Sequence, residues 1–292
     1  MKAKCVISLI LAAVMLASCS SVPDKTSESI SETASETVTD LTMPSIAPFE
    51  YEITEPVIES LTDSSDKITF CRDGNKITAN FTRPEGSGPY KTVIILGGLY
   101  SSLGFYSGKA KLYNENGYAV IEVHPTNNKV PEPYKEPAYI GDFVFEQAED
   151  LCAVIDSLKY LPDVDLSNIY LFGHSIGGLG TVYAGIYKQD EIRGMILVEP
   201  SFQHSSTMKF ENETRIDPDL YGVLSDLNVP VVIFKGTGER DDIPDFDHFY
   251  DKAIACLPDG QLAVIEGAEH AMLGEPGRQM VSKSVEILNT WG

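Results

Sequence analysis

The stretch of residues 168–180, NIYLFGHSIGGLG, constrains the fold more than any other part of the sequence. A short apolar run at 169–172 leads into the pattern G-x-S-x-G, and a helical pattern of small residues follows. This order predicts a strand, a sharp turn and a helix, because the glycines beside Ser175 let the backbone reverse without a Cβ clash. The turn would hold the hydroxyl of Ser175 at the carboxyl edge of a sheet. The pattern alone is weak evidence, so partners elsewhere in the chain decide what it means.

The N-terminal residues have the features of an export signal. Lys2 and Lys4 precede a short apolar run at 5–17, and the segment ends in LASC at Cys19. This ending resembles a bacterial lipobox, in which a signal peptide of residues 1–18 is removed and Cys19 is lipidated; an ordinary signal peptide is the alternative. We expect a bacterial cell-surface or other extracytoplasmic protein that is lipid-anchored at Cys19. No other stretch has 18 uninterrupted apolar residues, so we expect attachment by lipid alone.

The rest of the chain divides into a tether and one domain. Residues 19–49 are rich in Ser, Thr and Glu, and such a segment cannot bury enough apolar surface to offset its ordering entropy, which predicts disorder. Residues 50–292 are long enough for a single domain. The formal net charge of −21 argues against nucleic acid and anionic lipids as partners, because both are bound by clustered cations.

Three cysteines lie in the predicted domain, at Cys71, Cys152 and Cys256. Their wide and irregular spacing matches no zinc-binding pattern, and we predict neither a metal site nor a cofactor. One disulfide and three free thiols are both compatible with the sequence.

Within the domain, apolar runs typical of strands alternate with helical patterns. Two runs at 67–71 and 76–81 flank the turn sequence RDGN and predict an antiparallel hairpin. Further strands are predicted at 92–96, 118–123, 195–198, 231–234 and 262–265, and further helices at 105–116, 142–160, 246–256 and 275–289. This order predicts an α/β fold, a mostly parallel central sheet with helices on both faces. Ligands bind such sheets at the carboxyl ends of the strands.

A serine hydroxyl is a poor nucleophile until a neighbouring base takes its proton. The base in such sites is typically a histidine that a carboxylate orients. His270 follows the last predicted strand and comes third in the chain order serine, acid, histidine, so we predict it as the base. We expect a structural role for His174, which neighbours the nucleophile, and His124 could line the substrate pocket. His204 and His248 are expected at the surface or in a lid.

The sequence leaves the acid open. The strand before the last one leads into KGTGERDDIP, and a carboxylate there would lie beside the loop of His270. Asp241 is favoured, Asp242 also qualifies, and Glu239 is a weaker candidate. Glu199, at the end of the preceding strand, is the rival, because some enzymes of this architecture place the acid there.

Negative charge that develops on a substrate carbonyl needs preorganised donors. The N–H of Ile176 follows the nucleophile at a helix N-terminus, where the helix dipole also favours an anion. The N–H of Leu99 follows the Gly97-Gly98 pair at the end of an early strand. We predict these two groups as the oxyanion hole, and Tyr100 as a substrate-binding wall or hydroxyl.

Together these elements resemble the α/β-hydrolase family over about residues 67–292. The similar segments are GGLYSS at 97–102, GHSIGG at 173–178, GERDDIP at 238–244 and GAEH at 267–270. The segment RPEGSGPYKTVIILGG at 83–98 is similar to the branch that contains dienelactone-hydrolase-like and cutinase-like esterases.

The resemblance implies Ser175 as nucleophile, Asp241 as acid and His270 as base, with Leu99 and Ile176 as oxyanion donors. The sequence departs from the family in having Gly97 where many members have histidine before the oxyanion turn. It also has two adjacent aspartates, Asp241 and Asp242, at the position of the acid.

These observations predict an exported serine hydrolase, a carboxylesterase that works through an acyl-enzyme. Residues 199–218 are too short and polar for a large lipid-binding cap, so small or polymer-attached acyl esters are favoured as substrates. Peptidase, thioesterase and lactonase activities use the same machinery and are alternatives. A binding lipoprotein that keeps the fold without catalysis is an alternative of another class.

Overall fold

The structure is a computed structural model that describes residues 49–99, 101–126, 140–203, 220–238 and 247–292. The predicted signal peptide and nearly all of the predicted tether lie outside these residues. The strands are β1 Val57–Thr62, β2 Ser65–Arg72, β3 Asn75–Thr82, β4 Tyr90–Leu96, β5 Ala119–His124, β6 Val164–His174, β7 Gly194–Val198, β8 Val231–Gly236 and β9 Gly260–Ile265. The helices are α1 Ser107–Glu115, α2 Ile140–Ser157, the 3₁₀ turn Leu158–Tyr160, α3 Ile176–Lys188, α4 Leu220–Ser225, α5 Asp247–Cys256 and α6 Gly274–Trp291.

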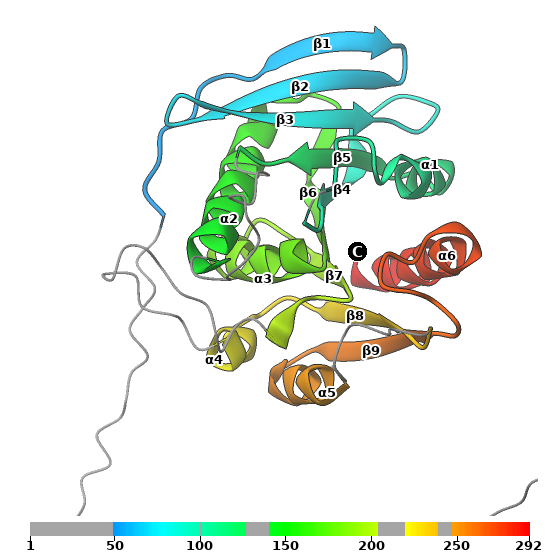
Figure 1. Ribbon diagram of the computed structural model, residues 1–292. Coiled ribbons are helices and arrows are strands. Elements are labelled where there is room, and N and C mark those ends of the chain that lie inside the picture. The colour runs from blue at the N-terminus through cyan, green and yellow to red at the C-terminus, as the bar shows by residue number, and fades with distance from the viewer. Residues whose placement is uncertain (1–48, 100, 127–139, 204–219, 239–246) are drawn as a thin grey trace, which may run out of the picture. The chain divides into compact units, whose positions relative to one another are not determined.

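The described strands form one sheet in the order β1-β2-β3-β5-β4-β6-β7-β8-β9 (Figure 1). The pairs from β5 through β4, β6, β7 and β8 to β9 are all parallel, whereas β1, β2, β3 and β5 pair antiparallel. The predicted fold class is therefore confirmed, including the N-terminal antiparallel hairpin. The hairpin turn uses Asp73 and Gly74, both at positive φ, as a two-residue turn between twisted strands requires.

Two hydrophobic cores cover the two faces of the sheet. Buried side chains of α2, α3, α4 and α5 belong to one core, and those of α1 and α6 belong to the other. Figure 1 shows α2 and α3 on one side of the central strands and α1 and α6 on the opposite side. Strands covered on both faces read as continuous apolar runs, which is why β4, with Val93 to Leu96 buried, was readily predicted.

Strand β1 was not predicted from the sequence. All six of its residues are exposed, and it pairs only with β2 at the edge of the sheet. A strand with no buried face carries no apolar alternation, so the sequence VIESLT gives no periodic signal. The short helix α4 was missed as well, because six residues are too few to establish a helical period.

The parallel pairing brings the carboxyl ends of six strands, β4 to β9, to one edge of the sheet. Gly97 follows β4, Ser175 follows β6, Glu199 follows β7, and the loop of His270 follows β9. The predicted site residues that the structure describes therefore lie on this edge, as expected for sheets of this type. Within the described residues, no helix is both long and apolar enough to span a membrane.

Candidate active site

Ser175 lies on a strained turn between β6 and α3. Its backbone has φ 56° and ψ −126°, a conformation that a residue with a side chain adopts only when the surroundings enforce it. The surroundings do so through two hydrogen bonds: the Ser175 N–H donates to the carbonyl of Val198 (3.0 Å), and its carbonyl accepts from the N–H of Ser201 (2.9 Å). Both partners belong to β7 or the residues just after it, so the neighbouring strand fixes the turn.

Two glycines let the loop after β4, residues 97–99, which is the predicted oxyanion loop, approach this turn closely. A Cβ on Gly177, in the first turn of α3, would lie 2.2 Å from the carbonyl oxygen of Gly97. A Cβ on Gly98 would lie 3.1 Å from the Cβ of Ser175. Because these two residues have no side chains, the end of β4 can lie directly against the turn of Ser175. Leu99 directly follows Gly98. Ile176 is the first residue of α3, and the N–H groups at the start of a helix have no acceptor within the helix.

The structure brings Ser175 and His270 together, although they are far apart in the sequence. Nε2 of His270 lies 2.9 Å from Oγ of Ser175, a hydrogen-bond distance suited to proton transfer. The Oγ of the buried Ser201 lies 3.3 Å from the same serine oxygen. The hydroxyl of Ser175 therefore has two polar partners, an imidazole and a second hydroxyl.

Glu199 lies on the other side of the imidazole. Its Oε2 is 3.9 Å from Nδ1 of His270, which is within ion-pair range and beyond hydrogen-bond range. The residue is 1% exposed, and its backbone φ is 46°. The carboxylate accepts hydrogen bonds from the N–H of Gly236, through Oε1, and from the hydroxyl of Tyr250, through Oε2. A buried carboxylate held in this way can stabilise positive charge on the imidazole ring.

Several residues singled out in the sequence lie outside the described residues. These are Asp241, Asp242, Glu239, Tyr100 and His204. Their roles stay predictions.

His124 and His248 lie on elements other than those that carry Ser175 and His270. His124 is half-buried at the end of β5, which β4 separates from β6 in the sheet, and its pocket role stays a prediction. His248 is exposed on α5, where a surface histidine was expected.

Four polar residues that contact the site were not predicted from the sequence: Tyr106, Lys109, Ser201 and Tyr250. Ser201 could have been found, because it follows β7, which neighbours the strand of the nucleophile. The other three lie on helices or beside them, and nothing in the local pattern marks a helix residue that points toward a distant loop.

His174, which is next to Ser175 in the sequence, is buried. Burial, together with the proximity of His270, lowers its pKa to about 3. The ring is therefore neutral near pH 7, which fits the structural role expected for it.

The described cysteines are free: Cys152 is buried, and Cys71 and Cys256 are half-buried. Within the described residues, no three His, Cys, Asp or Glu side chains are grouped to hold a metal ion.

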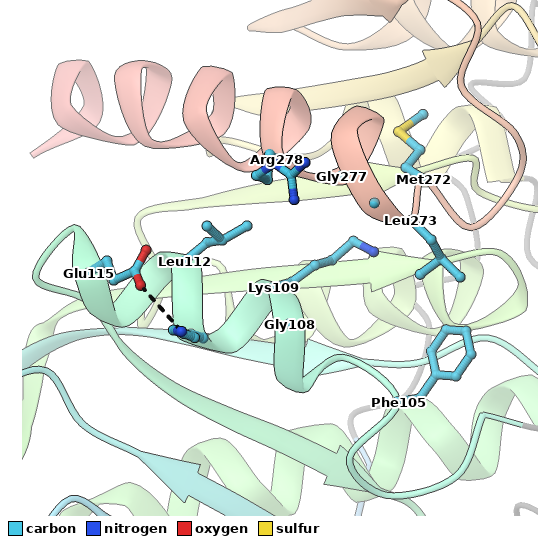
Figure 2. A pocket seen from close by; sticks show the side chains of 11 residues that line it. Phe105, Gly108, Lys109, Leu112, Glu115, Met272, Leu273, Gly277 and Arg278 are labelled. Atoms are coloured by element: carbon cyan, nitrogen blue, oxygen red, sulfur yellow. Dashed lines mark ion pairs between the residues drawn. The ribbon is translucent and has the colours of Figure 1, made fainter.

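A cavity of about 310 Å³ lies between α1 and the start of α6. Figure 2 shows Phe105, Leu112 and Leu273 along its wall, with Lys109 reaching across from α1. Neither Ser175 nor His270 lines it, so the cavity is separate from the contact between these two residues.

Residues 91–224 match a family model described as the alpha/beta hydrolase fold. The chain has the α/β-hydrolase fold. The resemblance seen in the sequence is confirmed at this level, and the G-x-S-x-G turn lies within the matched residues. No curated protein sequence matched the chain.

Solved structures of α/β hydrolases resemble the chain along most of its length. Est1E from Butyrivibrio proteoclasticus has a TM-score of 0.60 and 18% identity, over 81% of this chain and 100% of its own. An esterase from the archaeon Pyrobaculum calidifontis has a TM-score of 0.60 and 19% identity, over 78% of this chain and 86% of its own. A dienelactone-hydrolase-like promiscuous phosphotriesterase, P91 from metagenomic libraries, has a TM-score of 0.58 and 13% identity, over 78% and 98%.

Proposed function

We propose that this chain is a serine hydrolase that cleaves carboxylic esters, with Ser175 as nucleophile and His270 as general base. The observation that carries the proposal is the 2.9 Å contact between Oγ of Ser175 and Nε2 of His270. The strained backbone of Ser175 supports it, because strained residues cluster at functional sites. The esterases among the similar structures are consistent with the same chemistry.

In the proposed reaction, Nε2 of His270 takes the hydroxyl proton while Oγ of Ser175 attacks the ester carbonyl carbon. The oxyanion that forms is stabilised by the N–H groups of Leu99 and Ile176, and losing one such donor typically raises the barrier by about 3–4 kcal/mol. The C–O bond to the alcohol then breaks, and the imidazolium returns the proton to the leaving alcohol oxygen. Water, activated by the same imidazole, releases the acid from the acyl-enzyme and restores Ser175.

The imidazolium needs a carboxylate on its Nδ1 side. Glu199 is supported by its burial and by its 3.9 Å distance from Nδ1. Asp241 is supported by the sequence pattern and by the family resemblance, with Asp242 beside it. We propose that Glu199 stabilises the charge on His270. The losses of activity in Glu199→Gln and in Asp241→Asn distinguish these two candidates.

For the substrate, we propose small or polymer-attached acyl esters. One structure of the similar protein Est1E has ferulic acid bound, which makes esters of hydroxycinnamic acids, such as feruloyl esters, a sensible part of a substrate panel. Acetyl, lactone, thioester and peptide substrates would test the alternatives that share this machinery.

The test of the function uses the full domain and a fluorophosphonate probe. We expect covalent labelling and hydrolysis of p-nitrophenyl acetate, and both should be lost in Ser175→Ala. The variant Ser205→Ala changes a serine outside the proposed machinery and should retain both. A folded parent that neither reacts with the probe nor hydrolyses any ester of the panel would overturn the proposal, and would favour a binding lipoprotein instead.

We also propose that the protein is exported and lipid-anchored at Cys19, with the ester substrate and the membrane lipid as its partners. The support is the basic start, the short apolar run and the LASC sequence. Incorporation of an alkyne fatty acid in the parent, and its loss in Cys19→Ala, would test the anchor. Incorporation in both would contradict it.

A further inference from the structure

A buried chain of hydrogen bonds joins the oxyanion loop to the loop of His270. The N–H of Gly98 donates to Oη of Tyr106 (3.0 Å), and that hydroxyl lies 2.7 Å from Nδ1 of His174. At the far side of the ring, Nε2 of His174 lies 3.0 Å from the carbonyl oxygen of His270. His174 thus connects the residue before Leu99 with the backbone of the proposed base.

The direction of these hydrogen bonds follows from the chemistry of each group. The carbonyl of His270 can only accept, so Nε2 of His174 carries the proton. The ring of His174 is neutral, so its Nδ1 has no proton and accepts, and the hydroxyl of Tyr106 must donate to it. That leaves the oxygen of Tyr106 to accept from the N–H of Gly98, which is the contact observed. One tautomer of His174 satisfies the whole chain.

A second buried donor holds the next peptide of the same loop. Nζ of Lys109, on α1, donates to the carbonyl of Ala271 (3.0 Å), and the residue is 5% exposed. The same ammonium lies 5.5 Å from the ring centroid of Tyr106. Figure 2 shows the Lys109 side chain extending from α1 toward the segment of Met272 and Leu273. Consecutive carbonyls, those of His270 and Ala271, therefore each accept from a buried side chain.

The loop of His270 needs such support for two reasons. The side chain of His270 is 33% exposed, so packing alone does not fix its ring. Met272, two residues later, has a φ of 45°, a strained value that the surroundings must maintain. A ring that drifts by about 1 Å from its reactive position can lose about 100-fold in rate.

We infer that His174, oriented by Tyr106, and Lys109 are positioning residues that hold the backbone of the His270 loop so that its imidazole faces Ser175. This inference rests on the proposed function, in which His270 is the base. None of the three is proposed to touch the substrate. A role limited to filling the core would make the direction of the hydrogen bonds irrelevant, and that difference can be tested.

The decisive comparison is between two amides at position 174. His174→Gln retains an N–H near the place of Nε2, whereas His174→Asn retains a polar group only near Nδ1. We expect His174→Asn to lower kcat about 10- to 100-fold with KM within twofold of the parent, and His174→Gln to recover most of the loss. Equal loss in both variants, or parental kcat in His174→Asn, would overturn the inference.

Two further variants and a matched control separate positioning from stability. Tyr106→Phe removes the hydroxyl that sets the tautomer, and Lys109→Met removes a donor while keeping the apolar stem, so both should lower kcat several-fold. Tyr113→Phe is the control, because Tyr113 on α1 is a buried tyrosine in the same hydrophobic core as Tyr106, and its hydroxyl binds Oγ of Ser284 (2.7 Å) away from the site. It should lower Tm about as much as Tyr106→Phe and leave kcat unchanged. Equal kcat in Tyr106→Phe and Tyr113→Phe would count against the inference.

The tautomer can be read without any substrate. Long-range ¹H–¹⁵N NMR of the parent at pH 7 should show one histidine, missing in His174→Gln, with the proton on Nε2 and none on Nδ1. A proton on Nδ1 would overturn the inference. A parent without esterase activity or probe labelling would instead overturn the proposed function, whereas an active parent with unaffected variants would overturn the positioning role alone.

Discussion

Oε2 of Glu199 lies 3.9 Å from Nδ1 of His270, while Nε2 of the same ring faces Ser175. The imidazole therefore has the hydroxyl of Ser175 on one side and a buried carboxylate on the other. As the ring takes a proton, a negative charge at this distance and depth becomes favourable, because little water screens it.

We expect Glu199→Gln to lower kcat at least about 10-fold, because the neutral amide no longer stabilises the imidazolium. The measurement is steady-state hydrolysis of p-nitrophenyl acetate, with Tm as a check on folding. Asp241→Asn and Asp242→Asn are the parallel variants, and the largest loss identifies the carboxylate that orients His270. Parental activity in a folded Glu199→Gln would contradict the role proposed for Glu199.

The close approach of α3 to β4 makes a second prediction. In Gly177→Ala the new methyl would lie 2.2 Å from the carbonyl oxygen of Gly97, a backbone atom that cannot rotate away. We expect a loss of stability of about 1–3 kcal/mol, together with reduced kcat, because the oxyanion loop must shift. Urea unfolding and steady-state kinetics measure the two effects.

Gly180→Ala is the matched control for this steric argument. Gly180 lies on the same helix, and the atom nearest to its new methyl would be Cδ2 of Leu96, at 3.3 Å. Better helix propensity, about 1 kcal/mol for alanine over glycine, should offset that contact and leave the variant near parental stability. If Gly177→Ala has the same stability and the same kcat as Gly180→Ala, the close approach of α3 to Gly97 is not needed for stability or activity.

The buried His174 predicts a loss of stability in acid. Its folded pKa of about 3 is below the ordinary value of 6.5, so between these values the unfolded chain binds more protons than the folded one. Stability then falls as the pH drops below about 6.5, by about 3 kcal/mol at pH 4.5 from this group. Urea unfolding at several pH values should show a weaker acid dependence for His174→Gln than for the parent. Identical dependences would contradict the assignment.

The buried Lys109 predicts a gain in stability as the pH rises above 8. Burial lowers its pKa to about 8 from 10.5, so between these values the unfolded chain again binds more protons. The stability of the parent relative to Lys109→Met should therefore rise by about 1.4 kcal/mol for each pH unit between 8 and 10. The comparison with the variant cancels the contributions of other groups. A difference that stays constant over this range would mean that Lys109 keeps an ordinary pKa.

The sequence predicted the sheet because its central strands are buried on both faces and its helices are long. It also predicted Ser175 and His270, which the parallel topology brings to one edge. It did not predict Tyr106 or Lys109 as part of the site, because their contacts are with residues 68 and 162 positions away. Such contacts depend on how α1 packs against the loop after β9, and local patterns carry no information on that packing.

The proposed base lies 95 residues beyond the nucleophile, after the last strand of the sheet. The nucleophile turn, the oxyanion loop and Lys109 are all synthesised earlier. A chain still emerging from the ribosome, or one cut before β9, therefore carries the serine without its partner. The proposed esterase activity should begin only when β9 has paired with β8, so the appearance of activity would indicate that the sheet is complete.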